Sequence, residues 1–379
     1  MKKKLLVISM IVALVMTMTA VTACGGGGAD GPVTINVYAG GSDNVRQAWE
    51  DLITAFHETD TEIRVELQFI PADVGSVIDT FIASLEAGVE TTDIDIMDIS
   101  ENDLVRIVEL GGYDALLEVS PETIPNMAHV TVEPARGAGR GMPYRGTTVV
   151  LAYDSARVPN PPQTVEELHD WIRANPTRFA YNDPTTGGSG DSFVNTTIYN
   201  QMPVEAATSV DERWVAYWDA GFQILADLHP YLYQSGGRVL YPQRNQGTLD
   251  LLSTGEVDII PAWADMALQQ IAMGTLPDTV RIYQLDPPLT GQLQMAAIPT
   301  KSQNHEAALE FLNFVASVQS QEMLVEEMAA IPVIPADMLS EGTLAILTGF
   351  TTTDFRVMTI GDLGPRIQER WQSEISTLD

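Results

Sequence analysis

Strand and helix signals alternate through the first third of the chain, and this alternation constrains the fold more than any other feature. Val33–Tyr38, Ile63–Phe69 and Asp93–Ile99 have the β-branched, alternating character of strands. Between them, apolar residues recur at helical spacing in Val45–Phe56 and Val74–Leu85. Strand, helix, strand, helix, strand is the order of βαβ units. We therefore expect a largely parallel sheet with helices on its faces.

The alternation of strand and helix signals starts again at residue 147. Thr147–Tyr153 is predicted to be a strand, and Thr164–Glu167 has the form of a capping box that opens a helix. The later segments are strands at Arg178–Tyr181, Val257–Pro261, Ile282–Leu285 and Leu293–Ile298, and helices after Gly187–Asp191, at Asp211–Leu228, at Gln246–Ser253 and at Glu306–Val318. This order predicts an α/β fold of two lobes, each a mostly parallel sheet flanked by helices, with a hinge of crossing strands between them.

The expected domain boundaries follow from the same order. Residues 33–146 and 292–340 form lobe 1 and residues 147–291 form lobe 2. Residues 341–379 form a C-terminal helical segment that packs on the lobes.

The N-terminus has the pattern of an export signal. Lys2, Lys3 and Lys4 precede uncharged, largely apolar residues from 5 to 23. The only cysteine, Cys24, follows two small residues in a pattern that resembles the lipobox of bacterial lipoproteins, where the cysteine is acylated. We expect residues 1–23 to be a lipoprotein signal peptide and residues 24–32, which are rich in glycine, to be a flexible tether. The alternative is an ordinary secretory signal or an uncleaved membrane anchor with an incidental cysteine.

Composition excludes some partners. The formal net charge is −31, with 20 basic and 51 acidic residues, so nucleic acid and anionic lipid headgroups are poor partners. A single cysteine allows no internal disulfide, and stability must come from the apolar core. The acidic surface suits either a habitat of high ionic strength or an acidic proteome, and the sequence does not choose between them.

Enzyme motifs are absent from the sequence. The five histidines include no His-x-x-x-His pair, and there is no G-x-S-x-G turn or Walker loop. With 51 acidic residues, accidental carboxylate pairs are common, so no single pair indicates a glycosidase. We expect no catalytic activity, no cofactor and no metal.

Four segments together resemble a known family. They are the lipobox, the strand Asp95–Asp98, Gly141–Tyr144 followed by Leu151–Asp154, and Gly255–Trp263. In this order they resemble extracellular solute-binding proteins of ABC transporters, the broad periplasmic-binding-protein-like group that includes sugar, polyamine, thiamine and iron binders. The region from Tyr153–Pro159 to Arg178–Tyr181 is similar to the YnjB-like subgroup.

The resemblance implies a receptor. Two lobes would close around one solute and present it to a membrane permease with its ATPase subunits, and no bond would be broken. It also implies a monomer on the outer face of the cell membrane, held there by its lipid anchor. Two other functions stay open: a surface-anchored hydrolase acting on carbohydrate, and a sensing or adhesion lipoprotein with the same fold.

Candidate ligand-binding residues follow predicted strands, because ligands of open α/β sheets lie beyond the carboxyl ends of strands. In lobe 1 these are Gly41 and Ser42 after the first strand and Asn102 after the third. Exposed amides at a helix start there would hold a polar or anionic group. Ser42 and Asn102 would alternatively serve only as helix caps.

The hinge and lobe 2 supply the other candidates, which are Tyr144, Arg145, Tyr181, Ser189, Asp191, Trp263 and Asp265. Trp263 is the first choice, because in polyamine- and sugar-binding relatives an aromatic residue near this point lines the pocket. The alternatives are core packing for the aromatic residues and an N-cap for Ser189 or Asp191. Aromatic rings with nearby carboxylates favour a carbohydrate or an organic cation, and Arg145 could pair with an anionic group.

Overall fold

The computed structural model describes residues 32–71, 76–132, 134, 139–347 and 356–378. The predicted signal peptide, Cys24 and the predicted tether up to residue 31 lie outside the described residues. The described residues from 33 onward belong to one unit, Val33–Asp379.

The N-terminal strands pair in parallel, as the alternation predicts. β1 (Val33–Gly41) lies between β2 (Ile63–Pro71) and β3 (Ile96–Ser100), with Val33 opposite Ile63 and Val37 opposite Ile96. The helices that follow these strands are α1 (Asp43–His57), α2 (Val77–Glu86) and α3 (Glu101–Gly111). The apolar stripe expected on α1 is buried along its whole length.

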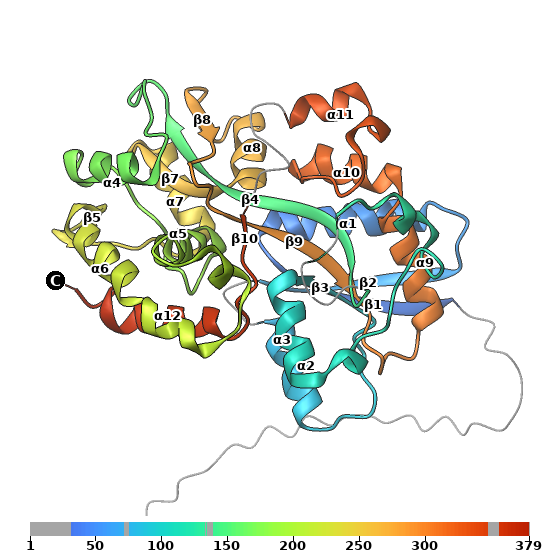
Figure 1. The fold of residues 1–379 in the computed structure, drawn as a ribbon. Helices are drawn as coiled ribbons and strands as arrows, with labels where there is room; N and C mark the ends of the chain where they lie inside the picture. The colour runs from blue at the N-terminus through green and yellow to red at the C-terminus, as the bar shows by residue number, and fades with distance from the viewer. Residues whose placement is uncertain (1–31, 72–75, 133, 135–138, 348–355, 379) are drawn as a thin grey trace, which may run out of the picture. The chain divides into compact units, whose positions relative to one another are not determined.

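Two long antiparallel strands continue the sheet. β9 (Thr290–Ala297) pairs with β3 on one side and with the first half of β4 (Met142–Asp154) on the other. The second half of β4 pairs with β7 (Ile259–Trp263) and β8 (Val280–Tyr283), also antiparallel. β4 therefore starts five residues before the predicted strand and joins the two parts of one eight-stranded sheet. Figure 1 shows it beginning on the side of α1 and α9 and ending beside β7 and β8.

Helices surround both parts of the sheet. In the middle of the chain they are α4 (Val165–Ala174), α5 (Gly188–Tyr199), α6 (Asp219–Leu228), α7 (Arg244–Ser253) and α8 (Ala264–Ala272). After β9 come α9 (His305–Val315), α10 (Val318–Met328), α11 (Glu341–Ile346), the two-residue strand β10 (Arg356–Val357), which pairs with β9, and α12 (Leu363–Glu374). Six short 3₁₀ helices and the hairpin β5 (Gln234–Ser235) with β6 (Arg238–Val239) complete the elements among the described residues.

Three predictions differ from the structure. A mostly parallel sheet was expected in lobe 2, but β4 pairs antiparallel with both β7 and β8. The capping box at Thr164 and Glu167 is confirmed, but Arg178–Tyr181 forms a single parallel bridge from Phe179 to Ile259 instead of a strand. The tryptophan-rich segment is also not one α-helix. It begins as a 3₁₀ helix, Glu212–Tyr217, whose N-cap Asp211 accepts the Arg213 amide at 2.9 Å, and the α-helix α6 starts only at Asp219.

The apolar core is divided by the crossing strand. Buried residues from 35–144 and 293–347 form two adjoining clusters, which we call the N-lobe. Buried residues from 149–289 and 360–375 form a separate cluster, which we call the C-lobe. β4 supplies Tyr144 to the N-lobe and Val149 to the C-lobe. The last helix, α12, returns to the C-lobe, where Trp371 packs against Tyr181.

Gly190, in the first turn of α5, lies against backbone. A Cβ atom at this position would stand 1.9 Å from the carbonyl oxygen of Asn182, whereas at Gly364, in the first turn of α12, the nearest atom would be 3.9 Å away. We expect Gly190→Ala to lower the free energy of unfolding by at least about 2 kcal/mol through overpacking. Gly364→Ala should change it little or raise it by up to about 1 kcal/mol. Equal midpoints for the two variants in urea denaturation would contradict this packing.

Candidate functional site

Three adjoining cavities form one cleft between the N-lobe and the C-lobe. Cavity A, of about 580 Å³, and cavity B, of about 320 Å³, share Ser42, Asn245 and Met266 in their linings. Cavity B and cavity C, of about 680 Å³, share Arg145 and Asp191. Because both lobes and the crossing strand line cavity B, it is the centre of the candidate site.

The N-lobe wall is the turn between β1 and α1. Gly41 lines all three cavities, and Ser42 lines cavities A and B. Ser42 is the N-cap residue of α1, but its side chain makes no capping hydrogen bond. Its hydroxyl instead contacts the Sδ of Met266 at 3.5 Å. Among the described residues, the amides of Asp43 and Asn44 have no acceptor, so the start of α1 presents free N–H groups.

The C-lobe wall begins at the turn before α5. Ser189 is completely buried, and its hydroxyl donates to the Oδ1 of Asn182 at 2.7 Å while its amide donates to the Oδ1 of Asn245 at 3.0 Å. These bonds fix the shape of the turn, and Ser189 does not line the three cavities. Asp191, two residues later, lines cavities B and C. Its carboxylate accepts from the side-chain amides of Asn195 at 2.8 Å and Gln368 at 3.0 Å.

Trp263 closes cavity B from the end of β7. Its indole packs so closely on Gly188 that a Cβ there would lie 2.7 Å from a ring carbon. Asp265, just inside α8, is buried and also lines cavity B. Its carboxylate accepts from Asn44 of the N-lobe at 2.9 Å and from Thr147 of β4 at 3.0 Å. Asp265 thus joins both lobes to the crossing strand.

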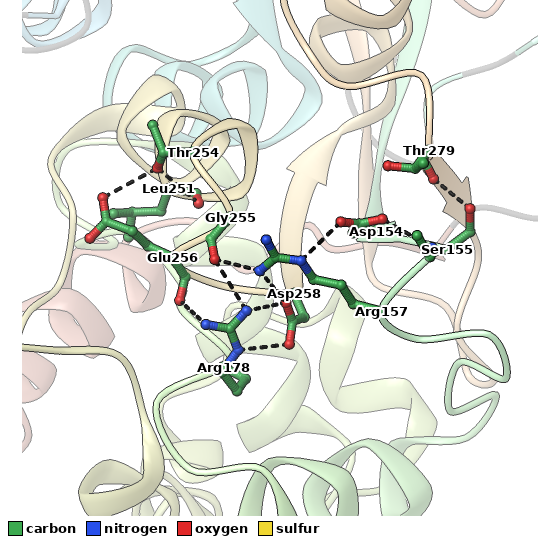
Figure 2. A network of polar contacts seen from close by, with 11 residues as sticks. Asp154, Ser155, Arg157, Arg178, Leu251, Thr254, Gly255, Glu256, Asp258 and Thr279 are labelled. Atoms are coloured by element: carbon green, nitrogen blue, oxygen red, sulfur yellow. Dashed lines mark hydrogen bonds and ion pairs between the residues drawn. The ribbon is translucent and has the colours of Figure 1, made fainter.

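A network of arginines anchors the strand that carries Trp263. Arg157 donates to the Gly255 carbonyl at 2.6 Å, and Arg178 donates to the Asp258 carboxylate through Nε at 2.7 Å and also through Nη2 (Figure 2). Gly255 has φ +73°, which a residue with a side chain rarely adopts. The segment Gly255–Asp258 therefore has a structural role, which is to hold the start of β7 against the rest of the C-lobe.

A bulge in β4 forms the floor of the cleft. Pro143 pairs with Met295 and Arg145 with Gln294, so Tyr144 is an extra residue between two ladder positions. The bulge lets the side chains of Tyr144 and Arg145 lie together, with the guanidinium 5.5 Å from the ring centre and Nε donating to the phenolic oxygen at 3.1 Å. Without it, consecutive side chains of a strand would point to opposite faces.

Below the bulge lies a buried polar chain. The hydroxyl of Tyr144 donates to Asp98 at 2.9 Å, and the indole of Trp49 donates to the other oxygen of Asp98 at 3.2 Å. Burial raises the pKa of Asp98, although the nearby Arg145 opposes the shift. Burial lowers the pKa of Arg145, but Tyr144, Asp98 and Asp265 raise it by more, so the guanidinium is charged.

The structure brings together six of the ten predicted residues around cavity B: Gly41, Ser42, Arg145, Asp191, Trp263 and Asp265. Asn102 lines cavity C, but its Oδ1 accepts the amides of Ile360 at 3.0 Å and Gly361 at 2.8 Å. Tyr144 and Tyr181 are buried, and Tyr181 packs against Phe193, Tyr241 and Trp371. Neither tyrosine lines the three cavities.

Other polar residues of the cleft were not predicted. Gln292 and Gln294 line cavities B and C from β9, and Asn245 lines cavities A and B. The sequence does contain a signal for Gln292 and Gln294, because two glutamines at alternate positions of an otherwise apolar strand indicate a polar face. Gln368 comes from α12, and no local pattern places that helix at the cleft.

No helix in the described ranges is long and apolar enough to cross a membrane. Nor do the described His, Cys, Asp and Glu side chains include a group of three that could hold a metal ion.

The sequence matches a family model described as bacterial extracellular solute-binding protein, over residues 51–340. The chain belongs to this family, which consists of binding proteins. It is also 27% identical over 216 residues to the protein YnjB of Escherichia coli K12. That match covers 53% of this chain and 54% of YnjB, so it spans only about half of the relative's length.

Solved structures share the fold. An ABC transporter substrate-binding protein from Bradyrhizobium japonicum has a TM-score of 0.66 at 17% identity, covering 90% of this chain and 99% of its own. A solute-binding protein from Thermotoga lettingae bound with α-D-tagatose has a TM-score of 0.65 at 18% identity, covering 90% and 93%. The periplasmic binding protein AfuA of Actinobacillus pleuropneumoniae, with fructose 6-phosphate, has a TM-score of 0.64 at 15% identity, covering 91% and 99%. The predicted two-lobed, periplasmic-binding-protein-like fold is confirmed.

Ionisation of Asp191 makes the stability of the folded protein depend on pH. Burial raises its pKa from 3.8 to about 6, and the Gln368 amide only partly opposes the shift. The folded protein therefore holds this proton more tightly than the unfolded chain. Ionising Asp191 costs stability above about pH 6, and no cost is present below about pH 4.

We expect Asp191→Asn to raise the Tm of the solute-free protein at about pH 8, and expect the gain to vanish near pH 4. Asp278→Asn, at an exposed position, is the matched control and should show a small difference that does not change with pH. Differential scanning calorimetry at both pH values checks this. A gain that is the same at both, or a loss at pH 8, would contradict the account of Asp191.

Proposed function

We propose that this protein captures a small polar organic solute in the cleft between the N-lobe and the C-lobe and delivers it to the permease of an ABC importer. The observation that carries the proposal is the lining of cavity B, to which Ser42 of the N-lobe, Trp263 of the C-lobe and Arg145 of the crossing strand all contribute. A solute held there contacts both lobes at once. Its binding free energy therefore favours the arrangement in which the lobes are together.

The proposed lobes are residues 33–146 with 292–340, and 147–291, and residues 341–379 are a C-terminal segment that packs on them. The division of the apolar core on either side of residues 145–148 supports these boundaries. A permease can distinguish the solute-bound protein from the free protein only if the surface that it contacts changes when the lobes close. A hinge confined to a few crossing strands allows that change with little loss of packing.

The solutes named for similar structures are diverse. They include α-D-tagatose and fructose 6-phosphate, and another is described as a GABA receptor. The fold therefore accommodates many small polar molecules, and side chains of the cleft must select among them.

Solute binding is testable with the full-length protein in detergent. A solute at about one hundred times its Kd should add roughly 2.7 kcal/mol to the free energy of unfolding if it binds only the folded state. A thermal-shift screen of sugars, polyamines and amino acids should therefore find a stabilising class. Trp263→Ala should abolish the stabilisation, whereas Tyr217→Ala, an exposed aromatic residue outside the cavities, should retain it.

Trp263 is 9% exposed, so its truncation also leaves a cavity. Trp263→Leu keeps more of the packing volume and should fold even if the alanine variant does not. A folded Trp263 variant with the affinity of the unchanged protein would remove this residue from the site. No stabilisation by any screened class would count against the function itself.

We further propose that Cys24 carries a lipid anchor that holds the protein on the outer face of the cell membrane. Support comes from the sequence alone, in the charged start, the apolar run and the small residues before the cysteine. In cells fed a labelled fatty acid, the protein should become labelled, and Cys24→Ser should lose the label because no other cysteine exists. Label that persists in the variant, or an unlabelled original protein, would show that the anchor proposal is wrong.

A further inference from the structure

The terminal nitrogens of the Arg145 guanidinium have no acceptor among the described residues. Arg145 is 4% exposed and lines both cavity B and cavity C. Its Nε donates to the Tyr144 oxygen, but its two terminal nitrogens have no hydrogen-bond or ion-pair partner among the described residues. Four of the five N–H donors of an arginine are on those nitrogens. A buried charge with so many free donors is costly unless something else in the cleft accepts from it.

The nearest carboxylates do not fill this role. Asp98 accepts from Trp49 and Tyr144, and Asp265 accepts from Asn44 and Thr147. Neither forms an ion pair with Arg145, although both contribute to keeping it charged. The protein thus holds the guanidinium in its protonated form and leaves its terminal nitrogens available at the cavities.

The start of α1 borders cavity B through Ser42 and Val45, and its first residues, Asp43 and Asn44, line the adjoining cavity A. This helix has 15 residues, and the hydroxyl of its N-cap residue Ser42 does not cap it. The amides of Asp43 and Asn44 remain without acceptors among the described residues. Free N–H groups at a helix N-terminus attract anions, in particular beside a buried guanidinium.

Asp191 presents the opposite charge to the same two cavities. Its oxygens accept from the neutral amides of Asn195 and Gln368, and within the described ranges no cation pairs with it. It forms no ion pair with Arg145. Arg145 and Asp191 therefore line the same two cavities with opposite charges and do not pair with each other.

Building on the binding function proposed above, we propose that the solute is a small aminocarboxylate. Its carboxylate binds the terminal nitrogens of Arg145 in bidentate fashion beside the start of α1, and its ammonium group binds Asp191. The carbon chain between them lies against Trp263. A diamine would leave Arg145 unpaired, and a neutral sugar would leave both charges uncompensated. The volume of cavity B, about 320 Å³, is at the small end of ligand sites and fits a molecule of this size.

The test pairs each probe with its uncharged analogue. Isothermal titration of the full-length protein in detergent uses the α-amino acids and the linear series from glycine to 6-aminohexanoate, each beside its carboxamide, with neutral sugars and linear diamines for comparison. At least one aminocarboxylate should bind, and its carboxamide should bind about a hundredfold more weakly, since it loses a buried charge pair. Arg145→Met should weaken the acid by a similar factor and make the acid and the amide bind alike.

Controls separate recognition from folding. Arg213→Met removes an arginine that stacks on Trp214 away from the cavities and should leave both affinities unchanged. Arg145→Lys keeps the charge and should restore part of the preference for the acid if the methionine variant does not fold. Asp191→Asn should weaken the aminocarboxylate but not the preference for acid over amide.

Three results would overturn the proposal. One is an acid that retains its advantage over the amide in Arg145→Met. Another is tight binding of sugars or diamines with none of aminocarboxylates, which would leave the binding function intact. A third is no binding by any of the three classes, which would count against both proposals.

Discussion

A single strand that joins the two parts of the sheet determines the rest of this structure. β4 pairs with β9 through Thr148 and with β7 from Val149, so the two apolar cores meet at neighbouring residues of one chain segment. A bulge at Tyr144 lies just before that point. Because the strand must pass between the cores, its polar side chains at the passage lie on the floor of the cleft instead of in either core. The position of Arg145 is therefore a consequence of the topology, and its environment follows from the bulge.

The cleft combines rigid and adaptable parts. Asp258 and its two arginines fix the start of β7, and the Ser189 bonds fix the turn before α5, so the C-lobe wall is preorganised. The two lobes meet through Asn44 and Asp265, and through Asn102 at the segment before α12. Gln269 of α8 also donates to the Glu327 carbonyl, and Arg106 pairs with Asp362. Polar contacts of this kind can exchange for contacts to a solute or water at low cost. The fixed walls then determine which solute fits, and the weak contacts allow the lobes to move around it.

The sequence predicted the architecture better than the site. The βαβ order, the stripe on α1 and the cap at Thr164 come from local periodicity and are found in the structure. The bulge at Tyr144 could not be predicted, because it depends on pairing with a strand about 150 residues later in the chain. For the same reason Tyr144 and Tyr181 were expected at the cleft but lie in the core, and Gln368 was missed. Pairs of strands and the return of α12 are long-range properties that no short pattern encodes.

The central claim is that a solute holds the two lobes together from within the cleft. Spin labels at Glu58 in the N-lobe and Asp170 in the C-lobe, both exposed, report the separation of the lobes by pulsed electron resonance in a Cys24→Ser background. Saturating amounts of a solute that binds should shorten and narrow the distribution of distances, because the bound state requires contacts to both lobes. A distribution that is identical with and without bound solute would contradict the account.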